Sequence, residues 1–231
     1  MPEPLVITID GPAGAGKSTV AQKLAARLGL MYVDSGATYR AAALKVLEAG
    51  VDPNDGPAVA KLIGATDVQV TTGEGEPHVL VDGEDVTARL RTPEVTLGAA
   101  QVSRLPAVRA KLIEMQRAFA RGRGVVMEGR DIGTVVFPQA QLKVFLKADM
   151  EERARRRLKQ DSRDSREATL EKTAYEIGRR DQLDAERKIS PLTPAADAVE
   201  IDSTDLLADQ VVEQIVDLVG KRGLGELGTA G

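Results

Sequence analysis

The sequence of 231 residues contains no cysteine, no tryptophan and one histidine, and aromatic residues make up only 3% of it. The lack of cysteine excludes disulfides, thiol catalysis and thiolate metal sites. One imidazole, that of His78, argues against a histidine-based zinc site and a Ser-His triad, and we expect His78 to be a surface residue. The scarcity of aromatic rings argues against a stacking platform for single-stranded nucleic acid.

Long apolar segments are also missing. No run of about 18 apolar residues occurs, and the N-terminus lacks a basic stretch followed by a long apolar one. We therefore expect no transmembrane helix, no signal peptide and a cytoplasmic protein. The net charge is −4, so the overall field does not attract nucleic acid, and we expect neither a nucleic-acid nor a membrane partner.

Short apolar runs rich in β-branched residues alternate with segments of helical periodicity, which predicts an α/β protein with a parallel sheet flanked by helices. The expected strands cover residues 5–9, 31–33, 124–128, 142–146 and 198–202. The expected helices include one that ends near Gly29 and others over about 38–47, 93–103, 105–121, 151–159, a stretch ending near 186, and 206–219.

One stretch departs from this alternation. Residues 68–71 and 79–81 are typical of short strands, and the turn sequence Asp82-Gly83 follows them. They predict an antiparallel hairpin unit inserted into the α/β pattern.

A phosphate-binding loop is predicted directly after the first strand, where Gly11-Pro12-Ala13-Gly14-Ala15-Gly16-Lys17-Ser18 matches G-x-x-x-x-G-K-[ST] between a strand and a helix. Its glycines let backbone N–H groups turn toward a polyphosphate, and the helix N-terminus adds a favourable dipole. Lys17 can reach the β- and γ-phosphates of ATP, and the Ser18 hydroxyl can ligate Mg²⁺. With Thr19, these residues form the expected ATP-binding set. The alternative is a glycine-rich turn that merely caps a helix.

A second polar segment, Asp34-Ser35-Gly36-Ala37-Thr38-Tyr39-Arg40, begins where the second strand ends. Ligands of parallel sheets bind beyond the carboxyl ends of the strands. A polar turn followed one helical turn later by Arg40 can hold a small phosphorylated acceptor. A plain helix cap by Asp34 or Ser35, with Arg40 on the surface, is equally compatible with these residues.

A third polar segment, Glu128-Gly129-Arg130-Asp131-Ile132-Gly133-Thr134, follows the third core strand. Arg130 can bind a phosphate with two hydrogen bonds, and Asp131 can accept from a sugar hydroxyl or a base amino group. An internal Arg–Asp ion pair that shapes the turn is the alternative, and both roles are compatible. Asp34 and Glu128 are candidate water-mediated partners of Mg²⁺, or they only cap turns.

Arg153, Arg156 and Arg157 follow the fourth strand at helical spacing, which places them on one face. They could close over the ATP phosphates as arginine fingers within the chain. The alternative is a solvated basic face paired with Glu151 and Glu152.

The polar interval over residues 160–166 has few apolar anchors and suits a hinged lid, whose closure would keep water from the phosphoryl group. We expect a core of residues 1–37, 121–152 and 171–222, an acceptor-binding insert over 38–120, a lid over 153–170 and a disordered tail over 223–231.

Five motifs together resemble the bacterial cytidylate kinases over nearly the whole chain, to about Val219. They are ITIDGPAGAGKST (7–19), VDSGATYR (33–40), GEDVTARLRTPEV (83–95), GRDIGTVVFP (129–138) and SPLTPAADA (190–198). The resemblance implies a nucleoside monophosphate kinase with a parallel core sheet, a mobile lid and an enlarged acceptor-binding insert. It implies transfer of the γ-phosphoryl group of ATP to CMP or dCMP, with Mg²⁺, in pyrimidine metabolism, by a monomer.

The resemblance also implies roles for single residues. Ser35, Arg180 and Asp184 would contact the ribose. Arg40, Arg130 and Arg187 would hold the acceptor phosphate, and Arg109 and Asp131 would read the cytosine edge. The expected catalytic set is Lys17, Arg130, Arg153, Arg156 and Arg157. Where the family carries a serine that touches the base, this chain has Ala100, which removes one base contact unless Ser103 or water replaces it.

Two other classes of function remain open from the residues alone. One is a small kinase for UMP, AMP or a non-nucleotide acceptor. The other is a nucleotide switch or a nucleic-acid-dependent ATPase, although no guanine-reading N-K-x-D motif occurs and the chain is short and acidic.

Overall fold

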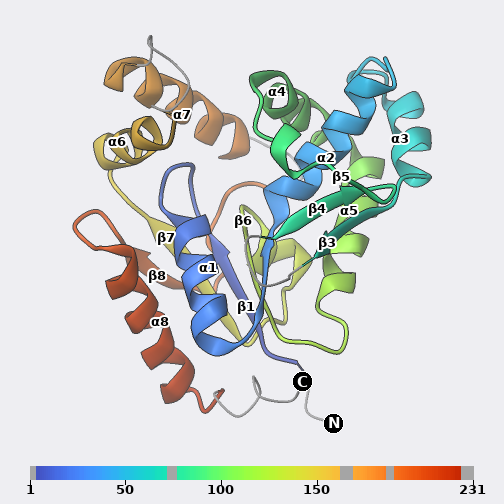
Figure 1. The fold of residues 1–231 in the computed structure, drawn as a ribbon. Coiled ribbons are helices and arrows are strands. Elements are labelled where there is room, and N and C mark those ends of the chain that lie inside the picture. The colour runs from blue at the N-terminus through green and yellow to red at the C-terminus, as the bar shows by residue number, and fades with distance from the viewer. Residues whose placement is uncertain (1–3, 72–76, 162–168, 186–189, 225–231) are drawn as a thin grey trace. The chain divides into compact units, whose positions relative to one another are not determined.

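The computed structural model describes residues 4–71, 77–161, 169–185 and 190–224 (Figure 1). They form two compact units. We call residues 1–31 with 122–231 the sheet unit, and residues 32–121 the insert unit. Residues 162–168 of the expected lid and 225–231 of the expected tail lie outside the described residues, and the expected domain boundaries stay a prediction.

Four strands of a five-stranded sheet of order β2-β6-β1-β7-β8 belong to the sheet unit, whereas β2 begins at Met31 and continues into the insert unit. β1 is paired in parallel with β6 and β7, and β7 is paired in parallel with β8. β1 therefore lies in the centre, and the loop that follows it emerges between the ends of two neighbours. The five expected strands are confirmed within two residues at each end, as β1 (Val6–Asp10), β2 (Met31–Asp34), β6 (Val125–Gly129), β7 (Leu142–Lys147) and β8 (Val199–Asp202).

The central strands are buried on both faces, which is why their sequences are nearly continuous apolar runs. Ile7 and Ile9 of β1 and Val126 of β6 are fully buried, and so are alternate residues of β7. Thr8 and Lys143 are the polar side chains inside β1 and β7, and the acidic residues Asp10 and Glu128 stand at or next to the carboxyl ends of β1 and β6. The polar segments that follow these strands therefore lie at one edge of the sheet.

Helices of the sheet unit pack in two pairs (Figure 1). α1 (Lys17–Leu28) packs on β1, β6 and α8 (Ala208–Lys221), and α6 (Met150–Asp161) packs on α7 (Leu170–Ala185). α1 ends at Gly29, which adopts the left-handed conformation with φ of 65°. These helices were expected from the sequence, and the structure confirms them.

The insert unit is built around helix α2 (Ser35–Glu48), which packs on α3 (Gly56–Gly64), α4 (Pro93–Val102) and α5 (Pro106–Phe119). A three-stranded antiparallel sheet completes it, with β3 (Val68–Thr71), β4 (His78–Val81) and the two-residue β5 (Glu84–Asp85). A short 3₁₀ helix, η1 (Thr87–Arg89), follows. The expected hairpin and its Asp-Gly turn are confirmed. His78 is exposed, as expected, and its ring lies 2.7 Å from the Asp85 carboxylate.

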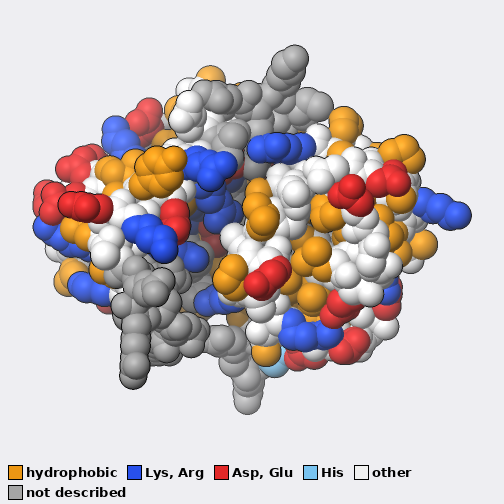
Figure 2. Space-filling model, turned by 90° about the horizontal axis from the view of Figure 1, so that it is seen from above, with side chains coloured by type: hydrophobic (Ala, Val, Ile, Leu, Met, Phe, Trp, Pro, Cys, Tyr) orange, Lys and Arg blue, Asp and Glu red, His pale blue; other side chains and the backbone are white. Residues whose placement is uncertain are grey.

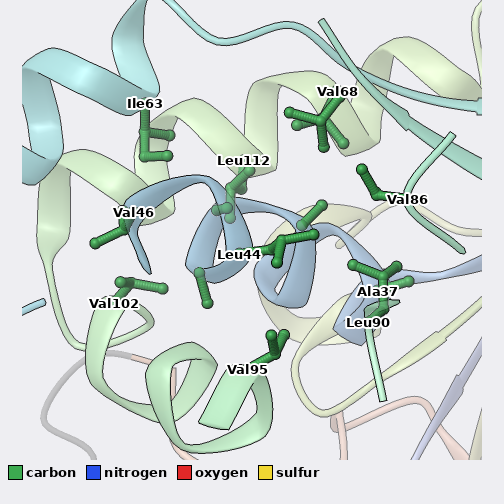
Figure 3. Close-up of a cluster of buried hydrophobic side chains, with 14 of the residues drawn as sticks. Ala37, Leu44, Val46, Ile63, Val68, Val86, Leu90, Val95, Val102 and Leu112 are labelled. Atoms are coloured by element: carbon green, nitrogen blue, oxygen red, sulfur yellow. The ribbon is translucent and has the colours of Figure 1, made fainter. Parts of the chain in front are cut away.

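Figure 3 shows how the core of the insert unit surrounds α2. Leu44 and Val46 of α2 point toward side chains from the other helices and the small sheet, among them Ile63 of α3, Val102 of α4 and Leu112 of α5. Small residues of α2, including Ala41, Ala42 and Ala43, are completely buried as well. The alanines allow close approach of α4, whose Gly98 faces Ala43.

Three local elements differ from the sequence prediction. α2 begins at Ser35 rather than near Thr38, because the Asp34 carboxylate accepts the Ala37 N–H at 3.2 Å and so caps the helix. α3 was not predicted, since glycines stand at both its ends and only two of its residues are buried. A π-helical turn, η2 (Ile132–Val136), was not predicted either, because such turns lack a characteristic sequence pattern.

Figure 2 shows basic, acidic and apolar side chains interspersed on one face of the molecule. Among the described residues, we find no helix with the length and apolarity needed to cross a lipid bilayer.

Truncating the insert core should destabilise the protein strongly. Leu112 is fully buried, whereas Leu97 on α4 is 64% exposed. We expect Leu112→Ala to lower the free energy of unfolding by about 2–5 kcal/mol, because it removes buried methyl groups and leaves a cavity. The matched control Leu97→Ala should change it by less than about 0.5 kcal/mol. Urea denaturation followed by circular dichroism measures both, and equal effects would contradict this core assignment.

Candidate functional site

The loop after β1 has the backbone conformation that only glycine adopts easily. Gly11, Gly14 and Gly16 have φ values of 149°, 78° and 90°. A Cβ on Gly11 would lie 2.0 Å from the Leu146 carbonyl oxygen, and one on Gly14 would lie 2.8 Å from the Arg153 carbonyl oxygen. Substitution at these glycines is therefore blocked by conformation and, at the first two, by neighbouring backbone.

The carbonyl groups of this loop are held by side chains. The Pro12 carbonyl accepts from Lys17 Nζ at 2.8 Å, and the Ala13 carbonyl accepts from an Arg153 nitrogen at 3.1 Å. The Ala15 carbonyl accepts from Arg156 at 3.3 Å and from the Ser203 hydroxyl at 3.2 Å. Three of the loop's carbonyl dipoles are thus fixed by donors.

A peptide N–H points away from the carbonyl of its own peptide plane. The N–H groups of Ala13, Gly14 and Gly16 share planes with the three held carbonyls, so each points to the opposite side. Gly16 also precedes α1, whose N-terminus has no side-chain cap among the described residues. This is the arrangement that binds anions at a helix N-terminus.

Asp181 of α7 completes the loop's contacts, and the sequence analysis did not single it out. Its carboxylate accepts the Ala13 N–H at 3.0 Å and forms an ion pair with the buried Arg153. Arg153 and Asp181 thus hold both sides of Ala13. In the sequence, the only indication of a role for Asp181 is its position next to Arg180, on a helix that is expected to end near the site.

Lys17 is only 5% exposed. The pKa of its ammonium group is lowered to about 7 by burial and, to a smaller extent, by the positive charges of Arg130 and Arg180, against the opposing effect of Glu128. These charges act on Lys17 because the side chains lie close together. Three predicted site cations therefore gather at the carboxyl edge of the sheet.

Ser18 and Glu128 lie side by side in this cluster. The Ser18 hydroxyl donates to the Glu128 carboxylate at 2.5 Å, and Glu128 is buried. A hydroxyl and a carboxylate oxygen next to a phosphate loop are hard ligands of the kind that Mg²⁺ prefers.

Arg130 contacts a carboxylate outside its own turn. Its Nε donates to Asp184 of α7 at 2.9 Å, and Asp184 is nearly fully buried. This ion pair ties the segment after β6 to α7, whereas the alternative considered from the sequence was a pair within the turn. Asp131 is buried beside it.

The three arginines of α6 are not equivalent. Arg153 is buried against the phosphate loop, Arg156 is half-buried, and Arg157 is exposed. Arg156 donates to Glu152 at 2.9 Å and to the Ser203 carbonyl at 2.6 Å, besides its contact with the loop. The expected pairing with Glu152 is therefore present, together with direct support of the phosphate loop.

In the insert unit, Arg40 lies over the first turn of α2. It donates to Asp34 at 2.5 Å, and a Cβ on Gly36 would come within 2.9 Å of the Arg40 guanidinium. Burial opposes ionisation of Asp34, but the charge and hydrogen bond of Arg40 outweigh it, and the pKa of Asp34 is lowered. Ser35 is buried in the same turn. Asp34 thus caps the helix and also orients Arg40. The sequence offered a plain helix cap or a polar turn that uses Arg40, and the structure has features of both.

Arg109 of α5 is 4% exposed, and its guanidinium carbon lies 5.8 Å from the centre of the Tyr39 ring. On α4, the Ser103 hydroxyl donates to the Ala100 carbonyl at 3.0 Å. The hydroxyl proton of Ser103 is therefore donated to a backbone carbonyl of its own helix end.

The predicted residues fall into two groups. The sheet unit brings together the phosphate loop, Ser18, Arg153, Arg156 and the segment from Arg130 to Asp131 with Asp184. Ser35, Arg40 and Arg109 belong to the insert unit. Arg187 lies outside the described residues.

The sequence matches known proteins over most of its length. Residues 7–221 match the family model of cytidylate kinase. A cytidylate kinase of Pelotomaculum thermopropionicum is 50% identical over 211 residues, 91% of this chain and 93% of the relative. One of Geobacillus kaustophilus is 48% identical over 216 residues, 94% of this chain and 96% of the relative.

Among solved structures, an uncharacterized protein from Eubacterium ventriosum has a TM-score of 0.50 at 11% identity, covering 94% of this chain and 98% of that chain, a likeness of fold alone. The matches in sequence extend over nearly the whole length and include every motif of the site. The chain belongs to the cytidylate kinase family.

Proposed function

We propose that this chain is a cytidylate kinase that transfers the γ-phosphoryl group of ATP to CMP or dCMP. An oxygen of the acceptor's phosphate forms a bond to the γ-phosphorus, and the bond from that phosphorus to the bridging oxygen breaks, so that ADP leaves with the electron pair. The observation that carries the proposal is the gathering of Lys17, Arg130 and Arg180 beside the phosphate loop. Such a concentration of positive charge fits two phosphorylated substrates rather than one.

ATP is proposed to bind through residues 11–19. The Gly14 and Gly16 N–H groups, which oppose the held carbonyls, would donate to its phosphates. Lys17 would exchange the Pro12 carbonyl for a phosphate oxygen. Because its ammonium is buried, its interaction with a phosphate is poorly screened by water.

The chain's oxygen ligands fit Mg²⁺ held jointly with nucleotide phosphates. Ser18 would be a direct ligand, and Glu128, already hydrogen-bonded to it, would bind through water. When bound, the ion would neutralise charge on the β- and γ-phosphates. The Glu128 contact supports this assignment, because it orients the hydroxyl.

The acceptor is proposed to bind through Arg130 and Asp131, with Arg180, Asp184 and Arg187. Arg130 would hold the acceptor phosphate, and its ion pair with Asp184 fixes the guanidinium before substrate arrives. Asp131 would accept from the cytosine amino group, and Arg180 and Asp184 would contact the ribose.

In the insert unit, Arg40 is proposed to bind the acceptor phosphate, Ser35 the ribose and Arg109 the cytosine. Asp34 orients Arg40, and Tyr39 contacts Arg109. Because both long side chains are already partly ordered, less side-chain entropy would be lost when the substrate binds. Ala100 offers no side-chain hydrogen bond, so discrimination between CMP and UMP would depend more on Arg109 and Asp131.

Transfer is proposed to depend on the arginines of α6, with Arg153, Arg156 and Arg157 supplying positive charge and residues 153–170 acting as the lid. Arg153 and Arg156 support the loop carbonyls, and Arg157 is exposed on the same helix. Exclusion of water favours transfer to CMP over hydrolysis. We further propose a cytoplasmic monomer that acts in pyrimidine metabolism.

Steady-state assays with a panel of monophosphates test this function. With ATP and Mg²⁺, we expect CMP and dCMP to have the highest kcat/KM, well above UMP and AMP, because Arg109 and Asp131 would read the cytosine edge. Lys17→Ala should lower kcat/KM by about 10²-fold or more, since it removes a buried charge at the transferred group. The matched control Lys23→Ala, an exposed lysine paired with Asp209, should be nearly normal. Comparable rates with AMP would refute the assignment.

A double-mutant cycle tests the contact of Asp181 with Arg153. We expect Asp181→Ala to lower kcat about tenfold or more, because the guanidinium loses the carboxylate that orients it. Arg153→Ala should then add little, giving a coupling energy of about 0.5–3 kcal/mol. Arg155→Ala, on the exposed face of α6 and paired with Glu151, is the control. Additive effects of the two substitutions would show that Asp181 does not act through Arg153.

A further inference from the structure

Asp10 is a buried acid for which the proposed chemistry has no use. It is the last residue of β1, directly before Gly11 of the phosphate loop, and it stands beside Gly129 of β6 in the parallel register. Its side chain is 5% exposed. A carboxylate in such a place needs hydrogen-bond partners to offset its burial.

Both carboxylate oxygens of Asp10 bind one turn of backbone. One oxygen accepts the Ile132 N–H at 2.9 Å, and the other accepts the Gly133 N–H at 2.7 Å. These are the first two residues of η2, where helical N–H groups have no partner within the helix. Asp10 therefore caps this turn from a different strand.

The acceptor segment, Arg130 and Asp131, is held by hydrogen bonds on both sides. Strand pairing fixes Gly129, and Asp10 fixes Ile132 and Gly133. Only Arg130 and Asp131 lie between them. With both ends held, the backbone that carries these two side chains has few conformations left.

Packing leaves the turn little room to shift. A Cβ on Gly133 would lie 2.8 Å from the Thr8 hydroxyl oxygen, 3.2 Å from Lys143 Cδ and 3.3 Å from an Asp10 oxygen. A side chain at this position would therefore crowd the side chains of Thr8, Lys143 and Asp10. The turn is thus seated directly on β1.

Charges around Asp10 affect its protonation. Burial raises the pKa of its carboxyl to about 6, against the lowering effect of the two N–H donors; the negative charge of Asp131 raises it, and Lys17 lowers it. At neutral pH the carboxylate form therefore predominates, with both oxygens able to accept. Protonation turns one oxygen into a hydroxyl, which is a weaker acceptor for an N–H than a carboxylate oxygen and also places a donor proton in the turn.

We propose that Asp10 is a positioning residue for the acceptor nucleotide, which holds the turn after β6 so that Arg130 and Asp131 are oriented to bind CMP. This rests on the proposed function. The phosphate loop starts at the next residue. The end of β1 therefore positions both the phosphate loop and the acceptor segment.

Kinetics of Asp10→Asn provide the test. The substitution keeps the shape but places an amide group against one of the two N–H donors. We expect the KM for CMP to rise about tenfold or more, with the KM for ATP changed less than about twofold, because the phosphate loop is held by other side chains. The control Asp209→Asn changes an exposed aspartate of the same unit that is paired with Lys23, and it should change neither KM. An unchanged KM for CMP, or equal increases in both values, would overturn the proposal.

The pH profile separates positioning from general damage. The substrate's phosphate and Lys17, whose pKa is about 7, titrate in the wild type and in Asp10→Asn alike. As pH falls through about 6, the wild type should show an additional loss of kcat/KM for CMP from protonation of Asp10, and Asp10→Asn should lack this step. Identical profiles would overturn the proposal.

Amide NMR of the wild type tests the same point without a variant that must fold. The N–H signals of Ile132, Gly133 and Asp131 should titrate with one midpoint near pH 6. If the Ile132 and Gly133 signals shift with pH while the Asp131 signal does not, the cap does not control the acceptor segment. A wild type that titrates in this way but fails to phosphorylate CMP would refute the proposed function while leaving the cap established.

Discussion

Binding a polyphosphate with backbone requires several N–H groups to point at one place, and peptide geometry then requires the carbonyl groups to point away. In this protein the outward carbonyls are not left to water. Lys17, Arg153, Arg156 and Ser203 each donate to one of them. The loop's conformation is therefore stabilised by side chains from α1, α6 and the segment after β8, and the N–H groups of the same peptide planes are thereby held on the opposite side.

The same edge of the sheet organises the acceptor segment. β1 ends in Asp10, which caps the turn after β6, and α7 contributes Asp181 to the phosphate loop and Asp184 to Arg130. Two acids three residues apart on one helix thus contact both segments. Movement of α7 would therefore disturb the phosphate loop and the segment after β6 together, through direct hydrogen bonds.

The sequence predicted well what depends on local patterns. Buried strands appear as apolar runs, the phosphate loop has a spacing dictated by its backbone, and the Asp82-Gly83 turn marks the hairpin. It could not predict what depends on the partner of a side chain. Asp10 and Asp181 look like ordinary acids in the sequence, because the N–H groups they cap come from residues far along the chain. The sequence does not reveal α3 because that helix is short and has a glycine at each end, nor η2 because such turns lack a pattern, and the placement of Arg187 stays a prediction.

A crystal structure with CMP and a non-hydrolysable ATP analogue tests the central claim most directly, that the held carbonyls prepare the loop for phosphate. The account predicts phosphate oxygens within hydrogen-bond distance of the Gly14 and Gly16 N–H groups, with Arg153 and Arg156 still on the Ala13 and Ala15 carbonyls and Lys17 moved from Pro12 to the phosphates. Phosphates bound elsewhere, with Lys17 still on the Pro12 carbonyl, would contradict it.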